Sequence, residues 1–215
     1  QIKTIQITLL SATNPVIIGT GSASINLTDN DFPLNPYISL VSSYSQDFNT
    51  LANTGTSSVL PTGWLFNETG TSLNTTYTAG TGSSTTGDTY SFGAASNADR
   101  AFGGLQSGSL ISTIGAQILN NSGLSITKLK ISYTGEQWRL GTESRLDKLS
   151  FQYSLNATSL TTGTWTDVTN LDFIAPVTLT IGAKDGNAIG NKTVITYTLR
   201  NLSIPNGSVL LIRWN

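Results

Sequence analysis

Histidine, cysteine and methionine are all absent from this sequence. Their absence excludes a Ser-His-Asp triad, a cysteine nucleophile, imidazole and thiolate metal sites, and any disulfide framework. Charged residues are also scarce, at 11% of the chain, and the formal net charge is −1. Nucleic-acid backbones are bound through clustered lysine and arginine, so no nucleic-acid partner is expected. No apolar run approaches the roughly 20 residues of a transmembrane helix, so no membrane insertion is expected.

Hydroxyl and amide groups dominate the polar residues that the chain does contain. Serine and threonine account for 59 of the 215 residues and asparagine for 18, while hydrophobic residues make up 38%. That hydrophobic content is enough for a folded core. The sequence starts at Gln1 instead of methionine, as it would after removal of a secretion signal. A chain that is thiol-free, charge-poor and rich in hydroxyls is predicted to be secreted or exposed on the cell surface.

Alternation of apolar and polar residues predicts an all-β fold, because this period of two places one set of side chains on each face of a strand. Val209–Trp214 is almost continuously apolar, as in a strand covered on both faces. Gly70–Gly93 is rich in threonine, serine and glycine, which predicts loops or exposed strands fixed by Tyr77, Tyr90 and Phe92. The strand-like runs are residues 128–133, 149–155, 177–181, 195–199 and 209–214, with turns at Asn120–Gly123 and Asp185–Asn187.

These strands predict a jelly-roll-like antiparallel β-sandwich over residues 37–215. Residues 1–36 are predicted to form an N-terminal strand arm and linker. In the arm, Ile5, Ile7 and Leu9 alternate with threonine and glutamine, which indicates a strand over Ile2–Leu10. The stretch Gly19–Pro36 has the glycine, proline and aspartate content of a linker.

Five short motifs resemble a bacterial extracellular jelly-roll family related to MAM and cleaved-adhesin domains. The resemblance covers about four fifths of the chain and implies a role in adhesion, glycan binding or spacing within large surface proteins. Domains of this kind continue past the final Arg-Trp strand into one more strand, whereas this sequence stops at Asn215. The motifs are Asp47–Asn49, Pro61–Trp64, Ala101–Gly104, Trp165–Val168 and Val209–Trp214.

A sandwich that lacks one strand leaves an open sheet edge, and such edges attract strands from other chains. The leading hypothesis is therefore an extracellular subunit that self-assembles into a fibre or surface layer by donor-strand complementation. Ile5, Ile7 and Leu9 would be the inserted residues, and other copies of the chain the partners. Two alternatives stay open: Ile2–Leu10 could pair within its own subunit, or the sequence could be a piece of a longer chain.

A second hypothesis is a carbohydrate-binding or adhesive module of a larger surface protein. Exposed tryptophans beside amides hold sugars on many β-sandwiches, and Trp138, next to Glu136 and Gln137, is the predicted glycan platform. Core packing is the alternative role for Trp138. Trp165 and Trp214 lie in strand-like runs and are expected to fill the core, whereas Trp64 is expected to be an edge anchor.

No enzymatic activity, metal centre or cofactor is expected. Glu136, Glu143 and Asp147 lie close in sequence, and paired carboxylates could serve glycan hydrolysis. Ordinary surface ion pairs with Arg139 and Arg145 are the alternative. Oxygen ligands for calcium occur at Asp29–Asp31 and Asp185–Asn187, but neither segment matches a known calcium loop, and Asx turns have the same composition.

Overall fold

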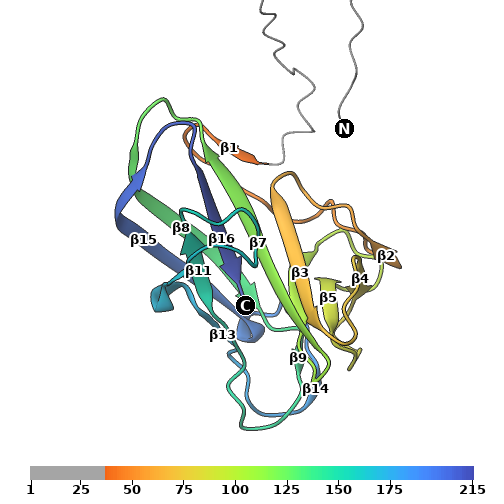
Figure 1. The fold of residues 1–215 in the computed structure, drawn as a ribbon. Helices are drawn as coiled ribbons and strands as arrows, with labels where there is room; N and C mark the ends of the chain where they lie inside the picture. The colour runs from red at the N-terminus through yellow and green to blue at the C-terminus, as the bar shows by residue number, and fades with distance from the viewer. Residues whose placement is uncertain (1–36) are drawn as a thin grey trace, which may run out of the picture. The chain divides into compact units, whose positions relative to one another are not determined.

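We analysed a computed structural model of the chain, in which residues 37–215 are described. The arm and linker of residues 1–36, including Ile5, Ile7 and Leu9, lie outside the described residues. Strands dominate the described part, which confirms the prediction of an all-β sandwich (Figure 1). The neighbouring strands are mostly antiparallel, with parallel pairings of β1 with β7 and of β4 with β5. The jelly-roll topology stays a prediction.

The largest sheet is organised around β7 (Leu110–Asn120), which has a neighbour on both edges. β16 (Val209–Trp214) pairs antiparallel with one edge of β7, and β3 (Trp64–Gly70) and β1 (Ile38–Leu40) share the other edge. The sheet continues from β16 through β11 (Phe151–Ser154) to β12 (Thr166–Asp167). The backbone groups of β7 are thereby satisfied from both sides along most of its length.

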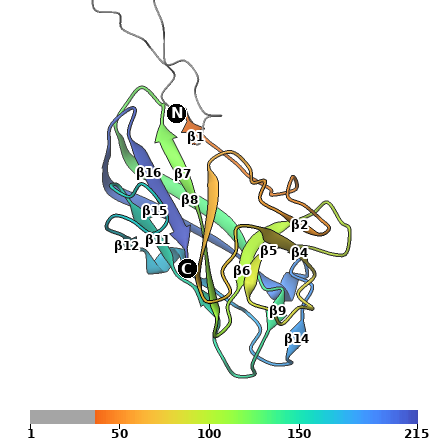
Figure 2. The same ribbon diagram turned by 45° about the vertical axis from the view of Figure 1, so that its right-hand side comes forward.

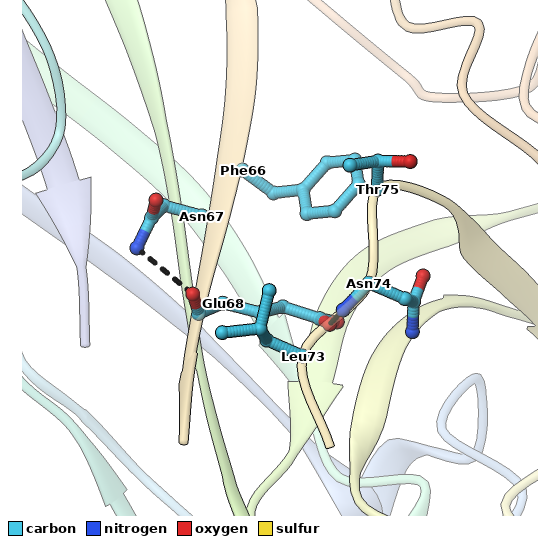
Figure 3. A pocket seen from close by; sticks show the side chains of 6 residues that line it. All are labelled: Phe66, Asn67, Glu68, Leu73, Asn74 and Thr75. Atoms are coloured by element: carbon cyan, nitrogen blue, oxygen red, sulfur yellow. Dashed lines mark hydrogen bonds between the residues drawn. The ribbon is translucent and has the colours of Figure 1, made fainter. Parts of the chain in front are cut away.

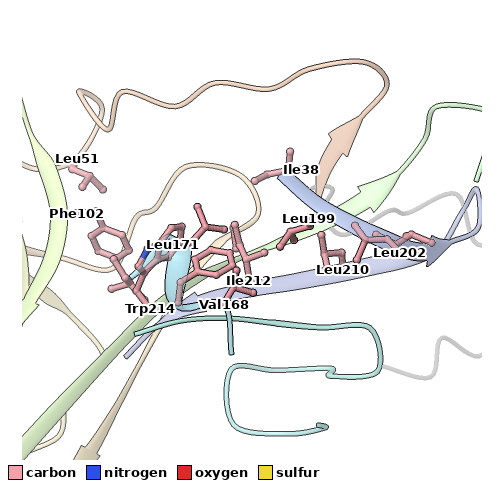
Figure 4. Packing of buried hydrophobic residues seen from close by; sticks show 14 of the residues in the cluster. Ile38, Leu51, Phe102, Val168, Leu171, Leu199, Leu202, Leu210, Ile212 and Trp214 are labelled. Atoms are coloured by element: carbon pink, nitrogen blue, oxygen red, sulfur yellow. The ribbon is translucent and has the colours of Figure 1, made fainter. Parts of the chain in front are cut away.

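A long two-stranded ribbon, made of β8 (Ile126–Glu136) and β15 (Lys192–Ile204), lies over the other side of the core. Its apolar face and that of the large sheet enclose the main hydrophobic cluster (Figure 4). Leu199 and Leu202 of β15 face Leu210, Ile212 and Trp214 of β16 in this cluster. The ribbon depends on this burial, since an isolated two-stranded hairpin is marginally stable in water.

A four-stranded sheet of order β2-β4-β5-β6 forms the part of the molecule around residues 56–105 (Figure 2). It includes most of the threonine- and glycine-rich region, where Tyr77, Tyr90 and Phe92 are buried as predicted. All five residues of β5 are buried, so the expectation of loops or exposed strands is wrong for this strand. The strands are β2 (Thr56–Ser57), β4 (Tyr77–Gly80), β5 (Asp88–Phe92) and β6 (Ala101–Leu105).

Short elements connect these sheets. The predicted strand over residues 177–181 does not form, and Leu179 and Ile181 are exposed, because this segment has no neighbouring strand to pair with in the described part. The remaining elements are β9 (Arg139–Leu140) paired with β14 (Gly182–Ala183), β10 (Lys148–Leu149) paired with β13 (Phe173–Ile174), and the 3-10 helices η1 (Thr169–Leu171) and η2 (Ile189–Asn191). Within residues 37–215, neither helix is long or apolar enough to cross a membrane.

Gly115 of β7 lets the loop after β11 close over the outer face of the large sheet. A Cβ at this position would lie 2.3 Å from the carbonyl oxygen of Ile212 and 2.6 Å from Leu160 Cδ2. We expect Gly115→Ala to lower the free energy of unfolding by about 1–3 kcal/mol in urea denaturation, because the backbone oxygen cannot yield. Gly108→Ala is the matched control, since no atom lies within 4 Å of its Cβ position. Equal losses in both variants would contradict this account of the packing.

Candidate functional site

The candidate site is the β8–β15 ribbon, whose strands pair regularly over most of their length. Lys192 of β15 is opposite Glu136 of β8, and the register continues to Arg200 opposite Lys128. The register then shifts before Ile204 pairs with Ile126. Asn201, within this irregularity, has a φ of 58°, a left-handed conformation that asparagine tolerates better than most residues. The regular part of the ribbon therefore ends at Arg200.

Both outer edges of the ribbon are free of backbone partners in the described part of the chain. β8 and β15 form a sheet of two strands, and no backbone hydrogen bond from another described segment reaches either outer edge. The short helix η1 lies near β15, but it donates no backbone hydrogen bond to it and accepts none. Each strand thus presents a row of N–H and C=O groups along one edge, which is a template for pairing with a further strand.

The two faces of the ribbon differ in chemistry. Leu129, Ile131 and Tyr133 of β8 lie directly opposite Leu199, Tyr197 and Ile195 of β15, and this face is turned toward the core. The opposite face carries polar side chains, including Ser132 and Thr196, whose hydroxyl oxygens lie 2.7 Å apart. A strand added at either edge would meet the same alternation of an apolar and a polar face.

Tyr133 attaches the ribbon to the core. Its hydroxyl donates a hydrogen bond of 2.6 Å to the carbonyl oxygen of Leu171 in η1, and its ring packs edge-on against Trp214. Burial raises the pKa of Tyr133 to about 12. The phenol therefore remains a neutral donor throughout the physiological pH range, and this contact does not titrate there.

Trp138 is buried, which corrects its assignment as a sugar platform. Its side chain is only 5% exposed, and its ring is stacked with Phe92 at a centroid distance of 6.2 Å. Gly186 covers it, since a Cβ there would lie 2.3 Å from the indole Nε1. With both neighbours in place, the ring has no open face for a sugar. The alternative role of Trp138, core packing, is the one the structure supports.

The two polar residues predicted beside Trp138 also have structural partners. Gln137 is buried, donates to the carbonyl oxygen of Val177 and accepts from the Val177 N–H, each at 2.8 Å. Glu136 is half-buried and accepts a hydrogen bond of 3.0 Å from Trp138 Nε1. Burial raises the pKa of Glu136, although the Trp138 hydrogen bond opposes the shift. The three residues predicted as a glycan platform instead make internal contacts, and those of Gln137 connect the end of β8 to the segment after β13.

The raised pKa of Glu136 predicts a pH dependence of stability. When the pKa of a carboxyl is higher in the folded protein than in the unfolded chain, the folded protein binds the proton more tightly. The contribution of this carboxyl to the free energy of unfolding therefore falls as the pH rises through its pKa. Glu136→Gln keeps an acceptor for Trp138 Nε1 and cannot ionise. We expect urea unfolding to show that Glu136→Gln gains free energy of unfolding over the original chain at pH 7, and that this gain is smaller at pH 4.

Glu143→Gln, at an exposed position, is the control and should show no such trend. An advantage of Glu136→Gln that is the same at both pH values would contradict the assigned environment of Glu136.

The other carboxylates considered in the sequence do not converge with Glu136. Glu143 is exposed, and Asp147 pairs with Arg145. Asp185 Oδ1 accepts the Asn187 N–H at 3.1 Å, which is an Asx turn. Within residues 37–215, no group of three acidic side chains is placed to hold a metal ion. The other calcium candidate, Asp29–Asp31, lies outside the described residues.

Two buried carboxylates, Glu68 and Asp88, were not identified from the sequence, and Figure 3 shows Glu68. Glu68 of β3 accepts hydrogen bonds from the Thr89 N–H at 2.8 Å and from the Asn74 N–H at 2.9 Å. Asp88 accepts from the Thr78 hydroxyl at 2.6 Å and from the Asn74 side chain at 3.2 Å. These bonds tie β3 to β4 and β5, so the carboxylates act as structural acceptors. A hollow of about 280 Å³ adjoins them, lined by Phe66, Asn67, Glu68, Leu73, Asn74 and Thr75.

Of the other three tryptophans, two fit their predicted roles and one does not. Trp214 is buried in the core, and Trp64, half-buried, donates to the Tyr44 hydroxyl at 3.0 Å. Trp165 is expected in the core but is only half-buried and lies outside the core cluster, just before β12, the last strand of its sheet. The guanidinium carbon of Arg213 lies 3.9 Å from the centroid of the Trp165 ring, a cation–π contact.

Comparison with known proteins gives no relative: no family model, no curated protein and no solved structure matches the chain. The resemblance to MAM-like and cleaved-adhesin-like domains therefore stays a prediction.

Proposed function

We propose that the chain is an extracellular structural subunit that self-assembles into a fibre or surface layer by strand addition. The observation that carries the proposal is the two-stranded layer of the sandwich, in which the outer edges of β8 and β15 have no strand partner among residues 37–215. Long free edges of this kind favour pairing with another chain. In this proposal the ribbon is the accepting element of each subunit.

The donating element in this proposal is the segment Ile2–Leu10, with Ile5, Ile7 and Leu9 as the inserted side chains. Main-chain hydrogen bonds would supply the affinity, and the alternate apolar side chains would select the correct edge. A contact between the arm of one copy and the ribbon of the next is head-to-tail. Because such contacts do not in general close on themselves, they build a filament.

The composition supports a passive material outside the cell. With no cysteine or methionine, the chain lacks the two side chains most readily oxidised. With 11% charged residues, its association would depend little on salt. No catalytic step is part of the proposal.

Deletion of Gln1–Leu10 tests the proposal directly. We expect the complete chain to form uniform fibres or sheets in negative-stain electron microscopy, and the shortened chain to remain a dispersed particle. The deletion removes none of residues 37–215, so circular dichroism should still report a β-rich fold. Polymers that persist after the deletion, or a complete chain that stays monomeric at every concentration, would rule the proposal out.

A second candidate function, glycan binding, is favoured by the surroundings of Trp165. Gln152 accepts a hydrogen bond of 2.7 Å from Arg213 Nε and donates one of 2.7 Å to Asp167. A half-buried indole, with the Arg213 guanidinium over its ring and amide and carboxylate groups beside it, has the chemistry of a sugar-binding surface. This surface replaces Trp138 as the place where a glycan could be held.

If glycans are the ligands, Trp165→Ala should reduce binding on a glycan array on the order of tenfold, which corresponds to the loss of one aromatic contact. Trp165→Phe keeps an aromatic ring and is the matched control, expected to retain most of the binding. Equal binding by the alanine variant, or no binding by the original chain, would reject glycan recognition at this surface.

A further inference from the structure

We infer that the accepting edge is the outer edge of β15 over Thr193–Leu199, and that its occupant is the segment Ile2–Leu10 of a second copy. The inference rests on the proposed function and makes it specific, since the ribbon has two free edges and the proposal alone does not choose between them. Charge and exposure favour β15 over β8, and the sequence pattern of the donor is compatible with the β15 edge.

The charges of the two edges differ. Thr193–Leu199 reads Thr-Val-Ile-Thr-Tyr-Thr-Leu and contains no charge, glycine or proline. The stretch of β8 opposite this run, Leu129–Gly135, carries Lys130, which forms no ion pair with a residue in 37–215. Lysines on an edge strand are a common protection against strand pairing.

The exposure of Tyr197 shows that the core side of β15 is incompletely covered. Tyr197 lies on the same face as Ile195 and Leu199, yet its side chain is 39% exposed, whereas Leu199 is 4% exposed. On the other face, Val194 is 72% exposed. An added strand would cover apolar surface on both faces of β15.

The donor and acceptor have matching two-residue periods. A strand laid along β15 in pleat register would place Ile5, Ile7 and Leu9 on the face of Ile195, Tyr197 and Leu199. Its threonines and Gln6 would then lie on the outer face with Thr196 and Thr198. A slip by one residue would put the apolar set into solvent, so the pattern restricts the pairing to alternate registers.

The length of the chain before the sandwich permits this exchange. The 26 residues from position 11 to position 36 span up to about 90 Å when fully extended, which is several times the length of a seven-residue strand. Lys192 and Arg200 flank the uncharged run, and the register shift after Arg200 ends the regular edge. These features limit the acceptor to about one strand of the donor's size.

Disulfide trapping tests the inference, because the natural chain has no cysteine and an introduced pair has no competitor. One variant carries Gln6→Cys and a second carries Thr196→Cys; the two are mixed and oxidised mildly. Ser132→Cys is the matched control acceptor, since it removes the same hydroxyl pair but lies on β8. Thr4→Cys and Thr8→Cys donors cover registers shifted by two residues. Non-reducing electrophoresis measures the cross-linked dimer.

We expect a donor cysteine to cross-link to Thr196→Cys about tenfold faster, or more, than to Ser132→Cys, because pairing holds the two sulfurs at disulfide distance. Faster cross-linking at Ser132→Cys would overturn the choice of edge and leave the proposed self-assembly in place.

A chain with Gln6→Cys and Thr196→Cys together separates the remaining outcomes. Cross-linking within a monomer would confirm the β15 edge as an acceptor but overturn exchange between copies, and with it the proposed function. Slow cross-linking at both acceptors for every donor would overturn the inference. Fibres that form under those conditions would show that assembly uses another surface.

Discussion

Backbone hydrogen bonding is the constraint on which this structure depends. A strand has donors and acceptors on both edges, and burial is tolerated only when those groups are paired. β7 meets the requirement with β16 on one side and β3 and β1 on the other. β8 and β15 meet it on one side each in the described part of the chain, although their length gives them the longest pairing in the molecule. Among residues 37–215, backbone pairing is thus complete at the centre of the large sheet and incomplete in the β8–β15 layer.

Aromatic packing keeps the open layer in place. Trp214, on the strand next to β7, contacts Trp64 of β3, Phe151 of β11 and Tyr133 of β8, with ring centroids 5.0 to 6.2 Å apart. One side chain therefore joins three strands of the large sheet to the ribbon. Offset and edge-on ring contacts add directional preference to the burial of apolar area. This explains how a two-stranded layer can hold a defined position without strands on its outer edges.

The sequence predicted the parts of the fold that local alternation controls. Residues 128–133, 195–199 and 209–214 became strands because each has a partner strand with a matching apolar face. Residues 177–181 have a similar alternation but no partner strand in the part of the chain that the structure describes, and alternation alone cannot reveal this. The burial of Trp138 and the roles of Glu68 and Asp88 depend on residues well removed in sequence: Phe92 for Trp138, Thr89 for Glu68 and Asn74 for Asp88. The residues that neighbour a position in the sequence do not predict such contacts.

Ordered addition of one donor strand and uncontrolled aggregation are close alternatives for a chain with such an edge. An uncharged seven-residue run with high β-propensity, such as Thr193–Leu199, is the kind of segment that stacks into cross-β structures when exposed. Lys192 and Arg200 at its ends act as gatekeepers against continued stacking. A donor strand of matching pattern would satisfy the backbone of this run once, and Lys3 in the donor would disfavour a further strand, as lysines on edge strands do. The chemistry of the edge thus favours the addition of one strand over the growth of a sheet.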